Sequence, residues 1–189
     1  MARIDDLLAN YKRRAAMPLR SGLPLSQRVW FLVQPPEEER RLISRITEFE
    51  MATTAVPLHW HRIDLSGAFA QWIDTFPDED ERRAILADPG IVEEYAQTMF
   101  RDHLRDLIAL QIAALPTDQR SSTLVALTGL MELYDLLHVS EVIEVLDPSF
   151  PGILAMFFPG EREDSIYRFL GARTGWDYLA VPILSDPMS

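Results

Sequence analysis

The start of the chain has the hydrophobic spacing of an amphipathic helix. Apolar side chains recur three or four positions apart, at Ile4, Leu7, Leu8, Tyr11 and Ala15. This spacing places them on one face of a helix, with polar side chains on the other. Pro18, Gly22 and Pro24 follow and favour an end to the helix. We therefore predict an N-terminal helix within residues 1–20.

Five short, mostly apolar runs follow along the chain. They are RVWFLV (28–33), PLHWHRIDLS (57–66), STLVALTGL (122–130), GILAMFF (152–158) and YLAVPIL (178–184). Apolar strands that alternate with helices are typical of a mostly parallel sheet covered on both faces. The pattern predicts one three-layer α/β domain over residues 1–189, with about five strands. Because proline cannot donate to a strand ladder, Pro182 places the last strand at an edge.

The segments between these runs have helical patterns. QPPEEE precedes a helix that carries Leu42, Ile43, Ile46 and Phe49, and Ser66 is placed to cap a short helix. A short acidic helix begins at DEDERR, and Asp88–Pro89 opens the longest helix, which runs to Pro116. We expect two more helices, in MELYDLLHVSEVIEVL (131–146) and in DSIYRFLGAR (164–173).

The residue types present exclude several kinds of chemistry. The chain has no cysteine, which excludes a thiol nucleophile, thiolate-bound zinc and a cysteine-held iron–sulfur cluster. Lys12 is the only lysine and precedes the first expected strand, whereas a P-loop needs a lysine after a strand. Hydrolysis by a P-loop is therefore excluded. Schiff-base chemistry on a lysine is excluded everywhere in the chain except at Lys12.

The charge of the chain is strongly negative but uneven. The net charge is -11, yet the first 28 residues contain six basic side chains (Arg3, Lys12, Arg13, Arg14, Arg20 and Arg28) against two acids. Because the rest of the surface repels phosphate, we expect at most weak nucleic-acid contact, through the basic N-terminal segment. No apolar run approaches the length of a membrane span, and we expect a cytoplasmic protein.

Residues 157–164, FFPGERED, raise the question of a phosphate-binding loop. Such a loop presents backbone N–H groups at a helix start, usually with several glycines. This segment has one glycine, and Glu161, Glu163 and Asp164 stand where the anion would lie. We therefore predict a Pro159–Gly160 turn before an acidic helix start, without a nucleotide.

His59 and His61 are two residues apart on an expected strand, so both side chains leave the same face. Two ligands do not make a zinc site, and a third would have to come from His103, His138 or a carboxylate, whereas Asp64 projects to the other face. No GxSxG motif occurs. We predict no catalytic, cofactor-binding or metal-binding residue; the alternative is a degenerate nucleotide-binding or metal-assisted hydrolase that uses the histidine pair.

Two blocks of the sequence resemble the BrxB family, the small non-enzymatic component of BREX phage-defence systems. They span most of residues 28–184 in the family's order. A strand entering a Pro-Pro-Glu helix start corresponds to Pro35, Pro36 and Glu37, and a strand ending in Asp-Leu-Ser to residues 64–66. The Thr-Gly turn falls at Thr128 and Gly129, and the Phe-Phe-Pro-Gly turn at residues 157–160. The second glycine that often follows this last turn in the family is replaced by ERED.

The resemblance implies an adaptor or assembly subunit that works beside a phosphatase-like protein called PglZ, a DNA methyltransferase and an ATPase. In a parallel sheet, loops at the carboxyl ends of the strands gather on one edge. We therefore expect the residues that dock the PglZ-like protein on that edge, at Gly129, Pro159, Gly160, Arg162 and Glu163.

Overall fold

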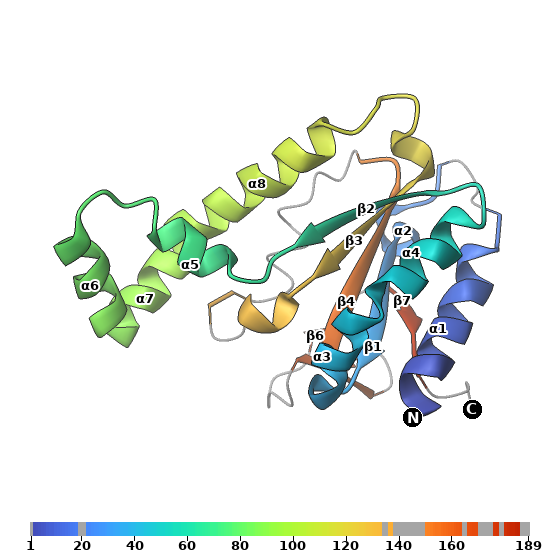
Figure 1. Ribbon diagram of the computed structural model, residues 1–189, viewed down its shortest axis with the longest axis horizontal. Coiled ribbons are helices and arrows are strands. Elements are labelled where there is room, and N and C mark those ends of the chain that lie inside the picture. Colours follow the sequence, from blue (N-terminus) through green and yellow to red (C-terminus); the bar gives the residue numbers. More distant parts are fainter. Residues whose placement is uncertain are drawn as a thin grey trace.

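The centre of the molecule is a parallel sheet with the strand order β2-β3-β4-β1-β7, seen in a computed structural model (Figure 1). The structure describes residues 2–18, 22–133, 136–137, 150–163, 166–169, 176–177 and 180–185. The parallel strands are β1 (Val29–Gln34), β2 (His59–Asp64), β3 (Thr123–Thr128), β4 (Ile153–Glu163) and β7 (Val181–Ile183). β5 (Ile166–Phe169) and β6 (Trp176–Asp177) add an antiparallel ladder to the end of β4.

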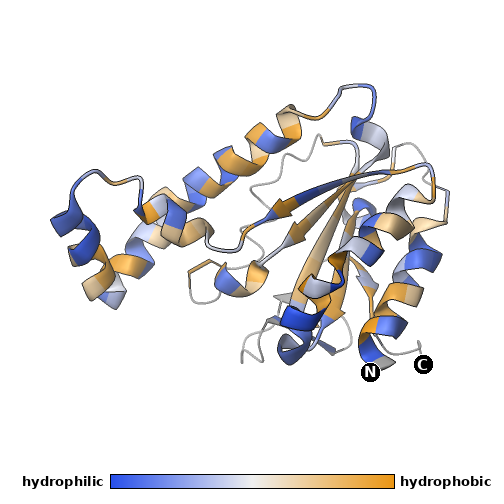
Figure 2. Cartoon of the chain, viewed as in Figure 1, coloured by the Kyte–Doolittle hydropathy of each residue, from blue (hydrophilic) through white to orange (hydrophobic). Residues whose placement is uncertain are grey.

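The strands form two cores because successive side chains point to opposite faces of the sheet. In β1, Val29, Phe31 and Val33 join one core, and Trp30 and Leu32 join the other. β3 and β4 alternate in the same way, and Figure 2 shows both strands as mostly hydrophobic. The prediction of a mostly parallel sheet packed by helices on both faces is confirmed.

One face is covered by α1 (Ala2–Ala15), α3 (Glu39–Ser44) and α4 (Ile46–Thr54), and we call its core the α1-side core. The N-terminal helix is confirmed, and all five of its predicted apolar residues are buried in this core. Short helical turns, α2 (Leu25–Arg28) and η1 (Pro36–Glu38), flank β1. The predicted helix after QPPEEE forms as η1, α3 and α4 in succession.

The opposite face is covered by α5 (Ala68–Ile73) and α8 (Arg101–Ala113), over what we call the α8-side core. Between them, α6 (Glu79–Ala87) and α7 (Pro89–Tyr95) extend away from the sheet, and Figure 2 shows α6 as largely hydrophilic. The longest helix begins after Asp88, as predicted, and contains the π-helical turn η2 (Ala96–Phe100). The remaining turns are η3 (Arg120–Ser122) and η4 (Leu130–Leu133). Among the described helices, none has the length and apolar character needed to cross a membrane.

The segment after GILAMFF differs from the prediction. β4 continues through Pro159 and Gly160 to Glu163, and β5 pairs with it in antiparallel register, so no turn forms at Pro159–Gly160 and no helix forms over 166–169. Tyr167 on β5 is 1% exposed and packs edge-on against Phe31, 4.7 Å between ring centroids. A strand delivers this side chain to the α8-side core while its neighbour Ile166 stays exposed.

Three other expectations have different outcomes. Ser66 does not cap α5: the N-cap position belongs to Gly67, whose backbone φ is 73°, and its N–H donates to the Glu132 carboxylate. Pro182 lies in β7, which pairs only with β1 among the described strands, so its predicted edge position is confirmed. Most of the helix predicted over 131–146 lies outside the described residues, and the parts that the structure describes are η4 and residues 136–137.

Candidate functional site

The carboxyl ends of four adjacent parallel strands bring the polar residues of the candidate site together. The site lies where β2, β3, β4 and β1 end and where the chain turns into α5, η4, β5 and η1. Ligands of open α/β sheets usually bind at this edge. Residues 35–37, 64–66, 128–129 and 157–160 all occur at this edge.

The ends of β2 and β3 are fastened to each other around Gly129. The Leu65 N–H donates to the Thr128 carbonyl at 2.9 Å, and the Ser66 N–H donates to Asp64 Oδ1 at 3.1 Å. Gly129 has a φ of 76°, and a Cβ atom there would lie 2.5 Å from the Ser66 nitrogen. Only glycine fits this turn, for both backbone and steric reasons.

Asp64 is held as a carboxylate by its neighbours. Arg62 donates to Asp64 Oδ2 at 2.5 Å and to the hydroxyl of Thr128 at 2.9 Å. Burial acts to raise the pKa of Asp64, but the hydrogen bonds from Ser66 and the charge of Arg62 outweigh it and hold that pKa below its usual value. The exposed end of β2 therefore carries a charged, hydrogen-bonded cluster.

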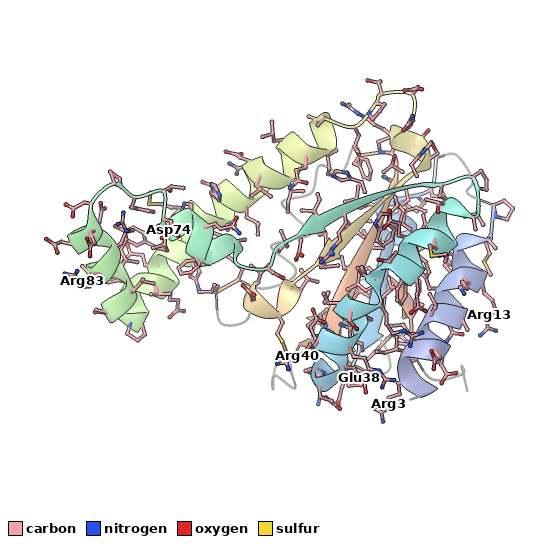
Figure 3. The ribbon with its side chains drawn as sticks, viewed as in Figure 1. Arg3, Arg13, Glu38, Arg40, Asp74 and Arg83 are labelled. Carbon is pink, nitrogen blue, oxygen red and sulfur yellow. The ribbon has the colours of Figure 1, made fainter. Side chains whose placement is uncertain are left out.

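A second polar pair is buried at the end of β1. Gln34 is 1% exposed and Glu39, at the start of α3, is 9% exposed, and the Gln34 amide donates to Glu39 Oε2. Burial raises the pKa of Glu39 to about 7; the Gln34 hydrogen bond opposes this rise and the Asp64 charge adds to it. Figure 3 shows the neighbours Glu38 and Arg40 on the same segment, at the end of the sheet.

Neither this pair nor Arg62 and Glu132 was singled out from the sequence, whereas Thr128 was named only as part of the Thr-Gly turn. Gln34 ends an apolar strand and Glu39 follows two other glutamates that suit a helix start, so each had an ordinary local explanation. The weak signal that could have marked Gln34 is a polar residue at the last position of an otherwise apolar run.

The structure separates the five predicted docking residues. Gly129, Pro159 and Gly160 are buried, whereas Arg162 is exposed, with its guanidinium 5.8 Å from the centre of the Tyr167 ring. A Cβ atom at Gly160 would lie 2.1 Å from the Arg168 carbonyl, because β5 passes directly against it. Glu163 ends β4, and its side chain lies outside the described residues. Among the four whose side chains or burial the structure describes, Arg162 is the one that a partner could contact directly.

The histidine pair lies on β2, whose alternation places both side chains on the face of Ile63 and the α8-side core. His59 is exposed, and His61 is partly buried with Nε2 unpaired. His103 lies on α8, and His138 falls outside the described residues. Within the described part of the chain, no three His, Asp or Glu side chains are grouped as a metal would require.

A pocket of about 790 Å³ opens at the other end of the sheet, before the strands begin. Its lining is mostly apolar and includes Met17, Leu23, Val56, Leu58 and Ile153. Arg28 also lines it, and donates to the Leu23 carbonyl at 3.0 Å and to the carbonyls of Phe150 and Gly152. This arginine therefore ties the start of β1 to the start of β4.

Comparisons of the chain with models of known protein families, with curated proteins and with solved structures find no significant match.

Proposed function

We propose that this chain is a non-enzymatic adaptor or assembly subunit of a BREX-type phage-defence system, working in the cytoplasm. It docks a PglZ-like protein through the exposed end of the β4–β5 ladder and the neighbouring strand ends, and so links this protein to the other BREX components. The proposal rests on the resemblance of two sequence blocks to the BrxB family.

One structural observation carries the proposal. The four segments that bear the resemblance lie far apart in the sequence, yet they occupy the ends of four adjacent strands. Pro159 is in register with Gln34 next to the Pro-Pro-Glu segment, and the residues around Gly129 and Ser66 contact each other. Segments that are similar to one family and meet on one edge are what a shared interaction surface would require.

The accessible side chains of this edge suit a protein partner. Glu161 and Arg162 are exposed on β4, and Ile166 is 39% exposed on β5. Arginine is enriched in protein interfaces and among the residues that contribute most to the binding energy. Arg162 also has its guanidinium placed over the Tyr167 ring, which limits the conformational entropy lost on binding.

The test is co-purification of the chain with a PglZ-like protein that is expressed together with it. Arg162→Glu reverses a charge at the centre of the proposed surface, and we expect recovery of the partner to fall at least about tenfold, as the loss of an interface arginine can cause. Arg83→Glu is the matched control, because Arg83 is an exposed arginine on α6, away from the sheet (Figure 3). This control should leave recovery unchanged.

Circular dichroism and thermal unfolding of both variants establish that they are folded. A folded Arg162→Glu variant that recovers the partner as well as the wild type would show that the surface is wrong. Failure of the wild-type chain to bind the PglZ-like protein or any other BREX component would refute the function itself.

A further inference from the structure

The buried Gln34–Glu39 pair contains two oxygen atoms without a hydrogen-bond donor. The Gln34 amide nitrogen donates to Glu39 Oε2, while Gln34 Oε1 and Glu39 Oε1 are both buried and unpaired. Leaving such buried groups without partners is energetically unfavourable. A donor hydrogen is therefore needed at these two oxygens.

A single proton on Glu39 satisfies both oxygens. An ionised carboxylate only accepts hydrogen bonds, but a protonated one has an O–H donor. The existing bond already sets the amide of Gln34 against the carboxyl group of Glu39. With a proton on Oε1, Glu39 can donate to Gln34 Oε1 and close a cyclic acid–amide pair with two hydrogen bonds. If the amide nitrogen and oxygen of Gln34 were exchanged, the Gln34 oxygen would face Glu39 Oε2. An acceptor would then face an acceptor.

We propose that Glu39 is held as a neutral acid bonded to Gln34, and that this acid–amide pair is a pH-sensitive fastening between α3 and the end of β1. Deprotonation removes one of the two hydrogen bonds and leaves a charge in a buried position. The start of α3 then loosens from the sheet edge. This inference stands independently of the proposed partner.

The charges around the pair favour the neutral acid. Glu38 Oε2 lies 3.6 Å from the guanidinium of Arg41. Arg45, at the end of α3, forms ion pairs with Asp5 and Glu48 and not with Glu39. Across the sheet edge, Asp64 on β2 is ionised and acts to raise the pKa of Glu39. Gln34 on β1, its register partner Pro159 on β4 and Thr128 on β3 are uncharged. The remaining charged side chains of η1 and α3 are Glu37 and Arg40, both exposed.

The direction of the pH effect follows from the raised pKa. Glu39 in the folded protein has a pKa of about 7, above its ordinary value of 4.5. Between these values the folded state binds more protons than the unfolded state, so rising pH lowers stability. The contribution of Glu39 is fully present below the unfolded pKa and is lost as the pH rises through the folded one.

The test is an NMR titration of the Glu39 carboxyl carbon in the full chain. We expect a midpoint close to 7, and a lower midpoint in Asp64→Asn, because that variant removes a neighbouring negative charge. A midpoint at the ordinary value for glutamate would overturn the proposal. A Glu39 carboxyl group that is fully ionised at neutral pH, and whose signal shifts when Mg²⁺ is added, would also overturn the proposal. In that case a cation would occupy the place of the proton.

Urea unfolding between about pH 5 and pH 8 provides a second measurement. In Glu39→Gln the new amide can donate to Gln34 Oε1 and does not titrate, so the loss of stability with rising pH should be smaller than in the wild type. Glu37→Gln, at an exposed neighbouring position, is the control and should retain the wild-type slope. Equal slopes in the wild type and Glu39→Gln would overturn the proposal.

Discussion

At the scale of single residues, two glycines share a conformation for different reasons. Gly22 and Gly129 have φ values of 78° and 76°, a region that costs other residues about 1–2 kcal/mol. A Cβ atom at Gly22 would meet nothing within 4 Å, whereas one at Gly129 would meet the Ser66 nitrogen at 2.5 Å. Gly129 therefore holds the β2 and β3 ends together, and a bulky substitution there would disturb the fold before it disturbed a partner.

Alanine at each glycine separates the two causes. Gly22→Ala should lower the free energy of unfolding by about 1–2 kcal/mol, the cost of the left-handed backbone. Gly129→Ala should lose this amount and about 1–3 kcal/mol more from overpacking against Ser66. Urea unfolding of both variants measures the difference. Equal losses would mean that the close approach to Ser66 contributes nothing.

At the scale of elements, local pattern was sufficient where local and tertiary preferences agree. β1, β3, β4 and β7 arise from short apolar runs between helical patterns, and α1 shows its buried face in its spacing. The β4–β5 ladder was mispredicted because Pro159–Gly160 is a strong turn signal and the following acids suit a helix start. What decides the structure there is a distant contact, of Tyr167 with Phe31 and Phe158.

The position of β3 explains how a proline fits within β4. The pairing of β3 with β4 reaches Met156, whereas β1 continues in register to Pro159. Beyond the β3 pairing, β4 has a neighbour on one side only at this level, so a residue without an N–H is tolerated there. No local sequence pattern reveals where the neighbouring strand ends. The Gln34–Glu39 pair was missed for the same reason, since their contact depends on how the crossover to α3 folds back.

Two neighbouring residues on β5 test whether this ladder is part of the core. Tyr167→Ala should lower the free energy of unfolding by about 3–5 kcal/mol, as expected for a buried aromatic side chain. Ile166→Ala, on the more exposed face of the same strand, should cost about 1 kcal/mol or less. Chemical denaturation provides both values. Similar losses for the two variants would contradict the alternation of β5.

At the scale of the whole molecule, the charge is divided between α1 and the rest of the surface. Figure 3 shows Arg3 and Arg13 on the outside of α1, and Lys12 beside them is also exposed. The same helix buries Leu7 and Tyr11 completely, and the Tyr11 hydroxyl is hydrogen-bonded to Thr53. The basic face therefore cannot be removed by deleting the segment without opening the α1-side core, and charge reversal is the sound way to test it.

This division leads to the last prediction, on nucleic acid. Because the net charge is -11 and the exposed basic side chains of α1 are few, binding to duplex DNA should be weak, independent of sequence and lost between about 50 and 200 mM salt. The double variant Lys12→Glu, Arg13→Glu should abolish it. The matched variant Arg83→Glu, Arg105→Glu changes the net charge equally but on α6 and α8, and should retain part of the weak binding at low salt. Fluorescence anisotropy with a labelled duplex measures all three proteins.

Tight binding that survives charge reversal on α1 would place a nucleic-acid surface on the acidic body of the molecule, against the electrostatic argument. It would favour a role at DNA over the adaptor function.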